Sequence, residues 1–226
     1  HVQDIAFDHL VFAPGSVTAL PPVPGLAEYG FEMKSMADAV ALRDRAIQQL
    51  EKADAIDDAQ ARRRMLRFVI VGGSYTGVEV AGEFQAFLHT AAKNYRHINR
   101  HEELKVTLVE IGDRILGALD RDLADYAADR LRGRGVELLL GESVREIGET
   151  FVNLRSGPQI PTETCIWTAG IAPAPIIAEA GLPTDDKGYI RCTPDLRVTG
   201  HDRVWAIGDC AVNPAPDGTA YPPTAQ

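Results

Sequence analysis

The residues best suited to chemistry lie in the stretch RFVIVGGSYTGVEVAGE, residues 67–83. An apolar run typical of a buried strand ends there in paired glycines, and a further glycine follows shortly after them. A strand that turns through glycines into a helix presents free N–H groups and the positive end of the helix dipole to a phosphate. The pattern therefore predicts a dinucleotide-binding turn. We expect its pyrophosphate contacts to come from Gly72, Gly73, Ser74, Tyr75, Thr76 and Gly77.

Ser74 occupies the position at which the G-x-G-x-x-G pattern normally has its middle glycine. A glycine there lets the backbone approach the phosphates, whereas the Cβ of Ser74 narrows that approach. Its hydroxyl could itself donate a hydrogen bond to a phosphate oxygen. A glycine-rich strand–helix turn that binds nothing is the alternative interpretation of the same residues.

Glu110 is placed to complete such a site. It ends a second apolar run, KVTLVE (105–110), where a carboxylate would accept hydrogen bonds from the hydroxyls of the adenosine ribose. The same charge would repel a 2′-phosphate, which favours NADH over NADPH. The interval from Gly72 to Glu110 exceeds the usual ~20 residues, and a long intervening helix accounts for the excess. A solvated strand end is the alternative for Glu110.

Glu79 lies in the first turn of the helix that follows the glycines. A carboxylate there interacts favourably with the helix dipole, which is its structural interpretation. Its functional interpretation is a catalytic residue that faces the nicotinamide end of the cofactor. Glu83 shares that helix face, where it could be partly buried.

The composition argues against several other functions. A net charge of −9 over 226 residues does not suit a nucleic-acid surface, whose phosphates require clustered cations. The one dense basic run, Arg62-Arg63-Arg64 with Arg67, is interpreted as a solvated linker. The three cysteines form no C-x-x-C pair, which suggests a reduced, cytosolic chain without a metal site or disulfides. No apolar stretch is long enough for a membrane-spanning helix.

Hydrophobic periodicity predicts strands alternating with helices. Ser35 and Asp38 form a capping box that opens one helix, and the pattern predicts further helices over 76–97 and 120–132. Strands are predicted within 67–71, 105–110, 136–140, 143–154 (two strands), 163–170, 188–192 and 203–211. This order predicts an α/β, Rossmann-like NAD-binding domain in which a parallel sheet is joined by an antiparallel β-hairpin layer.

Five segments occur in the order found in type II NADH dehydrogenases, which they resemble over nearly the whole chain. They are VIVGGSYTGVEVAGE, VTLVE, IWTAG, VWAIGDCA and PPTAQ. These enzymes belong to the FAD/NAD(P)-dependent pyridine nucleotide-disulfide oxidoreductase superfamily. The resemblance implies an NADH-binding domain, residues 31–172, inserted in a split and incomplete FAD-binding domain, residues 1–30 and 173–226.

The resemblance also implies contacts outside the glycine turn. FDHLVFAPGS resembles an FAD-domain motif that usually ends Ala-Thr-Gly, so Ala13 and Gly15 would contact FAD although Pro14 replaces the threonine. Gly208 would let the backbone approach, and Asp209 would accept a hydrogen bond from the ribityl chain. Cys210 beside them is interpreted as an inert buried thiol.

Two further segments match turns that meet the cofactors. Ala169 and Gly170 match the turn at the end of the NADH domain. Thr224, Ala225 and Gln226 resemble the start of a motif that lines the flavin and quinone site, with Gln226 as a catalytic residue.

The function implied is that of a flavin-dependent oxidoreductase passing hydride from NADH to FAD and on to a quinone or other electron acceptor. The location implied is cytoplasmic and peripheral to the inner membrane face, and a homodimer is compatible with it. The first dinucleotide fold of the family is expected before residue 1, and its membrane-associating helices after Gln226. We therefore expect this chain alone to bind NADH, to hold FAD weakly and to be inactive. An NADH-dependent ferredoxin or disulfide-type reductase, or a non-catalytic nucleotide-binding module, are the alternatives.

Overall fold

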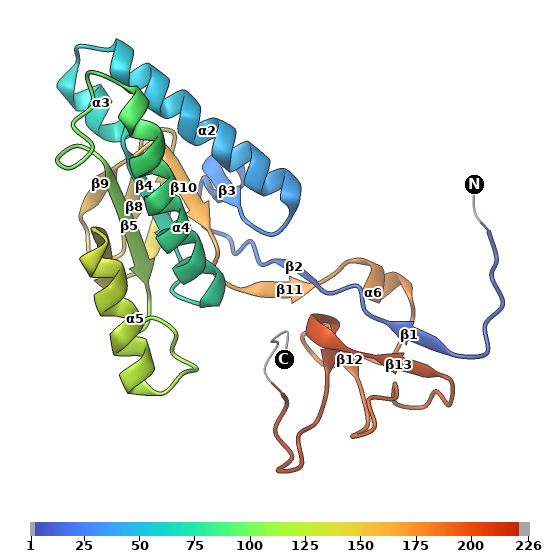
Figure 1. The fold of residues 1–226 in the computed structure, drawn as a ribbon. Helices are drawn as coiled ribbons and strands as arrows, with labels where there is room; N and C mark the ends of the chain where they lie inside the picture. The colour runs from blue at the N-terminus through green and yellow to red at the C-terminus, as the bar shows by residue number, and fades with distance from the viewer. Residues whose placement is uncertain (1–2, 222–226) are drawn as a thin grey trace. The chain divides into compact units, whose positions relative to one another are not determined.

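The computed structural model describes residues 3–221, which form two compact units (Figure 1). Unit 1 is built from both ends of the chain, His1–Val17 and Ile171–Gln226, and unit 2 is the intervening Thr18–Gly170. A middle unit thus lies between two segments that are separated in the sequence, and it begins earlier than the predicted residue 31. The assignment of NADH to the inserted part and of FAD to the flanking part stays a prediction.

Unit 2 contains the predicted parallel sheet, with β3 as a fifth strand that the sequence did not predict. Its order is β3-β10-β4-β5-β6. The strands are β3 (Gly30–Glu32), β4 (Arg67–Val71), β5 (Lys105–Glu110), β6 (Val136–Leu140) and β10 (Thr164–Trp167). Because all neighbouring pairs run parallel, the carboxyl ends of the strands meet at one edge of the sheet. That edge is where ligands bind in open α/β sheets.

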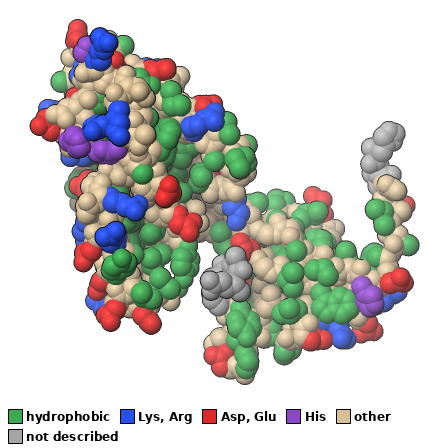
Figure 2. Space-filling view, in the orientation of Figure 1, with side chains coloured by type: hydrophobic (Ala, Val, Ile, Leu, Met, Phe, Trp, Pro, Cys, Tyr) green, Lys and Arg blue, Asp and Glu red, His purple; other side chains and the backbone are tan. Residues whose placement is uncertain are grey.

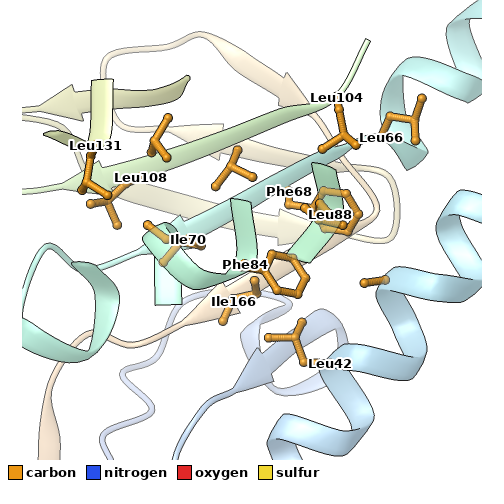
Figure 3. Close-up of a cluster of buried hydrophobic side chains, with 14 of the residues drawn as sticks. Leu42, Leu66, Phe68, Ile70, Phe84, Leu88, Leu104, Leu108, Leu131 and Ile166 are labelled. Atoms are coloured by element: carbon orange, nitrogen blue, oxygen red, sulfur yellow. The ribbon is translucent and has the colours of Figure 1, made fainter. Parts of the chain in front are cut away.

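Both faces of this sheet are covered. One face packs against helices, with Phe68, Ile70 and Ile166 meeting Phe84 and Leu88 of a long helix (Figure 3). The Phe68 and Phe84 rings meet edge to face, with centroids 5.3 Å apart. Burying each such side chain contributes roughly 1.5–3 kcal/mol. Two-sided burial explains why these strands read as continuous apolar runs.

The other face packs against an antiparallel layer, which is the predicted hairpin with one more strand. Its strands are β7 (Val144–Gly148), β8 (Phe151–Leu154) and β9 (Gln159–Pro161). Val69, Val109 and Trp167 of the sheet form a second core with Ile147 and Val152 of this layer. The alternation of neighbours along β4, Phe68 to one core and Val69 to the other, fixes the register of the strand.

The helices of unit 2 begin at recognisable caps. They are α1 (Leu26–Tyr29), α2 (Met36–Ala55), α3 (Ala59–Met65), α4 (Tyr75–Ala91) and α5 (Arg121–Gly133), with a 3₁₀ turn η1 (Ala92–Asn94). The predicted capping box of α2 is present: the Asp38 N–H donates to the Ser35 Oγ (3.2 Å), and the Ser35 N–H donates to Asp38 (2.7 Å). Helix α4 ends at Ala91, earlier than predicted, and η1 follows it.

The interpretation of the arginine run as a linker is wrong, because Arg62, Arg63 and Arg64 lie in helix α3. Asp58 caps this helix by accepting hydrogen bonds from the N–H groups of Gln60 (2.8 Å) and Ala61 (3.1 Å). The Arg62 guanidinium also donates to the Ile56 carbonyl (2.6 Å), which ties α3 to the end of α2.

Unit 1 is made of short paired strands. They are β1 (Leu10–Phe12) with β13 (Val204–Ala206), β2 (Ser16–Thr18) with β11 (Ile171–Pro173), and β12 (Ile190–Arg191) with β14 (Ala211–Val212). A short helix α6 (Ile176–Glu179) and a 3₁₀ turn η2 (Gly208–Cys210) complete it. Its core includes Ile177, Ile190, Val198, Ala206 and Cys210. Among residues 3–221, no helix has both the length and the apolar character needed to cross a membrane.

Candidate dinucleotide-binding site

The turn between β4 and α4 requires two of its glycines. Gly72 has a φ of +109°, and a Cβ added there would lie 2.9 Å from the backbone of Ala169. A Cβ on Gly77 would lie 1.8 Å from the carbonyl oxygen of Gly72, closer than any real contact. The start of α4 is therefore packed directly against the end of β4, a closeness that only glycine allows.

The first turn of α4 presents backbone N–H groups. Ser74 is its N-cap but its side chain makes no cap hydrogen bond. The first backbone bond runs from the Val78 N–H to the Ser74 carbonyl (3.0 Å). The N–H groups of Tyr75, Thr76 and Gly77 come before Val78 in the chain, so they have no hydrogen-bond acceptor within the helix and can donate to an external acceptor. Such groups, with the helix dipole, suit an anion.

Glu110 joins this turn to the loop that follows β5. The Gly73 N–H donates to its Oε2 (2.5 Å), and the Gly112 N–H donates to its Oε1 (2.7 Å). A Cβ on Gly73 would lie 3.0 Å from the Glu110 side chain, which would then have to shift by a few tenths of an ångström. Each carboxylate oxygen can accept a second hydrogen bond. The carboxylate is therefore fixed in place with acceptor capacity left for ribose hydroxyls.

The loop over residues 111–117 was missed by the sequence reasoning. The Leu116 N–H donates to the Gly73 carbonyl (2.7 Å), and Leu116 reaches this position with a φ of +51°. The Arg114 guanidinium donates to the Gly117 carbonyl (3.0 Å). Gly112 and Gly117, which follow β5, were the one signal in the sequence that could have indicated this loop. A cavity of about 450 Å³ is lined by Gly73, Ser74, Glu110, Gly112, Asp113, Arg114 and Gly117.

The predicted turn at Ala169 and Gly170 lies beside the glycine turn. The Thr168 hydroxyl donates to the Val71 carbonyl (2.8 Å), and the Thr168 N–H donates to the same oxygen (2.9 Å). These bonds hold Ala169 against Gly72. The structure thus brings together the ends of β4, β5 and β10, which carry all the predicted residues of unit 2 except Glu79.

Glu79 and Glu83 lie on the exposed side of α4. The expected partial burial of Glu83 is wrong, because the side of α4 that carries Phe84 and Leu88 packs on the sheet and leaves Glu83 in solvent. Both glutamates line a cavity of about 460 Å³ between α2 and α4, and Thr76 lines it too. The predicted approach of Glu79 to a nicotinamide stays a prediction.

Unit 1 brings together its own predicted residues. Strands β1 and β13 run parallel with Phe12 opposite Ala206, so the two segments that follow them leave the pair at the same end. The Ser16 hydroxyl donates to Asp209 (2.8 Å) across this junction. Gly15 and Gly208 have φ values of +71° and +76°, and a Cβ on either would meet no protein atom within 4 Å.

Cys210 is fully buried beside these residues. Its thiol contacts the carbonyls of Ile207 (3.1 Å) and Phe12 (3.5 Å). Burial raises the pKa of this thiol, which disfavours the reactive thiolate. Thr224, Ala225 and Gln226 lie outside the described residues.

Comparison with known proteins shows the family to which this chain is similar. A family model described as pyridine nucleotide-disulphide oxidoreductase matches residues 1–226. The chain is 32% identical over 227 residues to the demethylphylloquinone reductase NdbB of Synechocystis sp., covering 99% of this chain and 51% of that protein. It is 28% identical over 229 residues to the type II NADH:quinone oxidoreductase Ndh of Mycobacterium tuberculosis, covering 97% and 49%.

The chain thus spans about half the length of these two relatives. Among solved structures, NDH2 from Plasmodium falciparum in complex with NADH matches with a TM-score of 0.81 at 21% identity, over 92% of this chain and 45% of that one. At this identity the likeness confirms the fold.

Proposed function

The chain belongs to the pyridine nucleotide-disulphide oxidoreductase family, and from this premise we propose that it is part of an FAD-dependent NADH dehydrogenase. The reaction passes hydride from NADH to FAD and on to a quinone. FAD, when bound, supplies the redox chemistry, and the protein supplies binding, orientation and electrostatics. The names of the similar Synechocystis and Mycobacterium tuberculosis proteins favour a quinone over a ferredoxin or disulfide acceptor.

The observation that carries this proposal is the linked pair of the α4 amino terminus and Glu110. The N–H groups of residues 75–77 would hold the pyrophosphate of NADH, with Gly72 and Gly77 allowing the close approach. The Glu110 carboxylate, positioned by Gly73 and Gly112, would accept from the ribose hydroxyls. Ala169 and Gly170 would add backbone contacts at the neighbouring strand end.

Unit 1 would supply part of the FAD site. Ala13, Gly15, Gly208 and Asp209 follow the paired strands β1 and β13 at one end. The glycines in this segment have open space where a Cβ would lie, which suits a ligand passing close to the backbone. Asp209, oriented by Ser16, would accept a hydrogen bond from the ribityl chain.

The remaining residues of the site are placed by analogy within the family. Glu79 would face the nicotinamide, and Thr224, Ala225 and Gln226 would line the flavin and quinone site. A location at the inner face of a membrane on the cytoplasmic side, and a homodimer, are part of the same proposal. The segments assigned to FAD are 1–30 and 173–226, and the segment assigned to NADH is 31–172.

Titration calorimetry of the chain with NADH, NADPH and ADP-ribose tests the binding site. We expect NADH and ADP-ribose to bind and NADPH to bind more weakly, because Glu110 and the exposed Asp113 would repel its 2′-phosphate. If neither NADH nor ADP-ribose binds up to about millimolar concentration, the proposed NADH site is refuted.

The Ser74→Gly variant is the matched comparison for the atypical residue of the turn. Because Ser74 makes no side-chain cap bond, its loss should change stability by only a few tenths of a kcal/mol. If its Cβ hinders the pyrophosphate, NADH affinity rises in this variant. An unchanged affinity would refute that explanation of Ser74.

A further inference from the structure

A second polar cavity, of about 500 Å³, lies at the other edge of the unit 2 sheet. Strand β4 begins at Arg67, which lines this cavity, and ends at Val71 next to the glycine turn. At about 3.3 Å per residue, the two ends of the strand are roughly 13 Å apart. The lining residues are Ala59, Arg63, Arg67, Glu102, Glu103, Lys105 and Pro161.

Two of its cations are direct neighbours. Arg67 of β4 and Lys105 of β5 are paired in register at the start of the two strands. Paired residues on adjacent strands point to the same face of a sheet, so two positive side chains start side by side. Like charges placed in this way repel each other unless an anion lies between them. Arg63 of helix α3 brings a third positive charge to the same cavity.

These three cations have no side-chain ion pair or hydrogen bond within residues 3–221. Neither of the two carboxylates that line the cavity forms an ion pair with them within the described residues. Glu103 is engaged elsewhere, 3.7 Å from Arg62 and accepting a hydrogen bond from the Asn99 N–H (2.7 Å). Glu102 is exposed. Figure 2 shows Lys and Arg side chains, with Asp, Glu and His side chains among them, over the end of unit 2 that carries α3, on a chain whose net charge is −9.

We propose that this cavity binds a phosphate group, held by Arg63, Arg67 and Lys105. Arginine offers a planar fork of donors that matches phosphate geometry, and lysine adds a compact positive charge. The cavity falls within the size range of small-molecule sites. The phosphate is carried either by a small soluble compound or by a lipid headgroup, and it binds independently of the dinucleotide turn.

Calorimetric titration of the full chain with pyrophosphate tests the site. Arg67→Gln and Lys105→Gln should each weaken binding about tenfold or more, because each removes a charge-assisted hydrogen bond. Arg132→Gln is the matched control, since it removes the same charge from an exposed pair on α5. Ser74→Asp is the second control: aspartate is a favourable N-cap, and its charge would repel pyrophosphate from the glycine turn.

Binding that survives Ser74→Asp and Arg132→Gln but is weakened by Arg67→Gln supports the proposal. Loss in Ser74→Asp with retention in Arg67→Gln would place the pyrophosphate at the glycine turn and overturn it. Equal weakening in Arg67→Gln and Arg132→Gln would show a net-charge effect and also overturn it.

Co-sedimentation with phosphatidylglycerol vesicles distinguishes a lipid headgroup from a small soluble phosphate compound. If the wild-type chain sediments with the vesicles, the Arg67→Gln variant does not, and pyrophosphate does not bind, the phosphate is that of a lipid headgroup. If the wild-type chain binds neither pyrophosphate nor the vesicles, the proposal is refuted.

Discussion

At the scale of single residues, Glu110 has a structural role in addition to the ribose contact that we propose for it. Its position at the end of β5 predicts contact with a ribose. The structure shows that it also accepts from Gly73 and Gly112, and so holds the glycine turn and the following loop together. If Glu110 also binds the ribose, its replacement changes the structure of the turn as well as the cofactor specificity.

Replacing Glu110 by glutamine should therefore weaken the site rather than convert it to NADPH. A glutamine side chain has one accepting oxygen, so one of the two N–H groups would face its NH₂ donor instead. We expect a loss of about 1–3 kcal/mol in unfolding free energy and weaker binding of both NADH and NADPH. Urea unfolding and calorimetry measure the two effects, with Glu102→Gln as an exposed control. Tighter NADPH binding at unchanged stability would contradict the double role.

Residue type made part of this site predictable. Gly72 and Gly77 are needed for backbone approach, and Glu110 follows a clear apolar run, so each leaves a signal in the sequence. The contact between Leu116 and Gly73 leaves none, because it depends on a left-handed φ at a leucine. The exposure of Glu83 could not be predicted either, since helical spacing alone does not say which flank of a stripe faces solvent.

At the scale of elements, the helices that cover the sheet are tied to it by a polar cluster around Glu163. The Gln49 amide of α2 donates to this carboxylate (3.1 Å), and Arg64 of α3 lies 3.7 Å from it. Arg45 of α2 donates to the Glu163 carbonyl (2.6 Å). Gln49 is fully buried, so its amide depends on this partner.

Replacing Glu163 by alanine should destabilise unit 2 by about 1–3 kcal/mol. The change leaves the buried Gln49 amide without an acceptor and removes the anion between two arginines. The control is Asp44→Ala, which breaks an ion pair on α2 whose side chains are more than half exposed and should cost little. Urea midpoints measure both. Equal effects of the two substitutions would show that the Glu163 cluster does not hold the helices.

Helix α4 should give the protein a pH dependence through His89. Burial, with positive charge from His101 and Arg100, lowers the pKa of His89 from its ordinary value of 6.5. The unfolded chain then takes up this proton before the folded one, so this contribution to stability is complete above about pH 6.5 and falls as the pH drops towards the lowered pKa. Thermal midpoints from about pH 7.5 to about 5.5 should fall less steeply in His89→Gln. An identical pH profile in that variant would contradict the assignment.

The elements that the sequence did not predict are short ones. Helix α3 depends on the Asp58 cap and on contacts that Arg62 and Arg64 make with distant segments. Strand β3 has three residues and is defined by its pairing with β10, far along the chain. Long elements with a repeated apolar pattern were predictable, because their own residues specify both the period and the buried face.

At the scale of the whole molecule, one unit is inserted between two segments of another. Strands β1 and β13 come from opposite ends of the chain and pair in parallel. Periodicity cannot predict this pairing, because neither three-residue strand carries a period of its own. The order of motifs predicted, through family resemblance, a domain split between the two ends of the chain but not this pairing, and the fold of the described residues confirms the α/β architecture.

The central claim is that unit 2 binds NADH through the glycine turn and Glu110. The most direct measurement is the shift of backbone amide NMR signals of the full chain on addition of ADP-ribose, which carries the same pyrophosphate and adenosine ribose. We predict the largest shifts at Gly73, Tyr75, Thr76 and Gly112, with little change at Arg67 and Lys105. Shifts confined to other parts of the chain, or no shifts at about millimolar ligand, would contradict the claim.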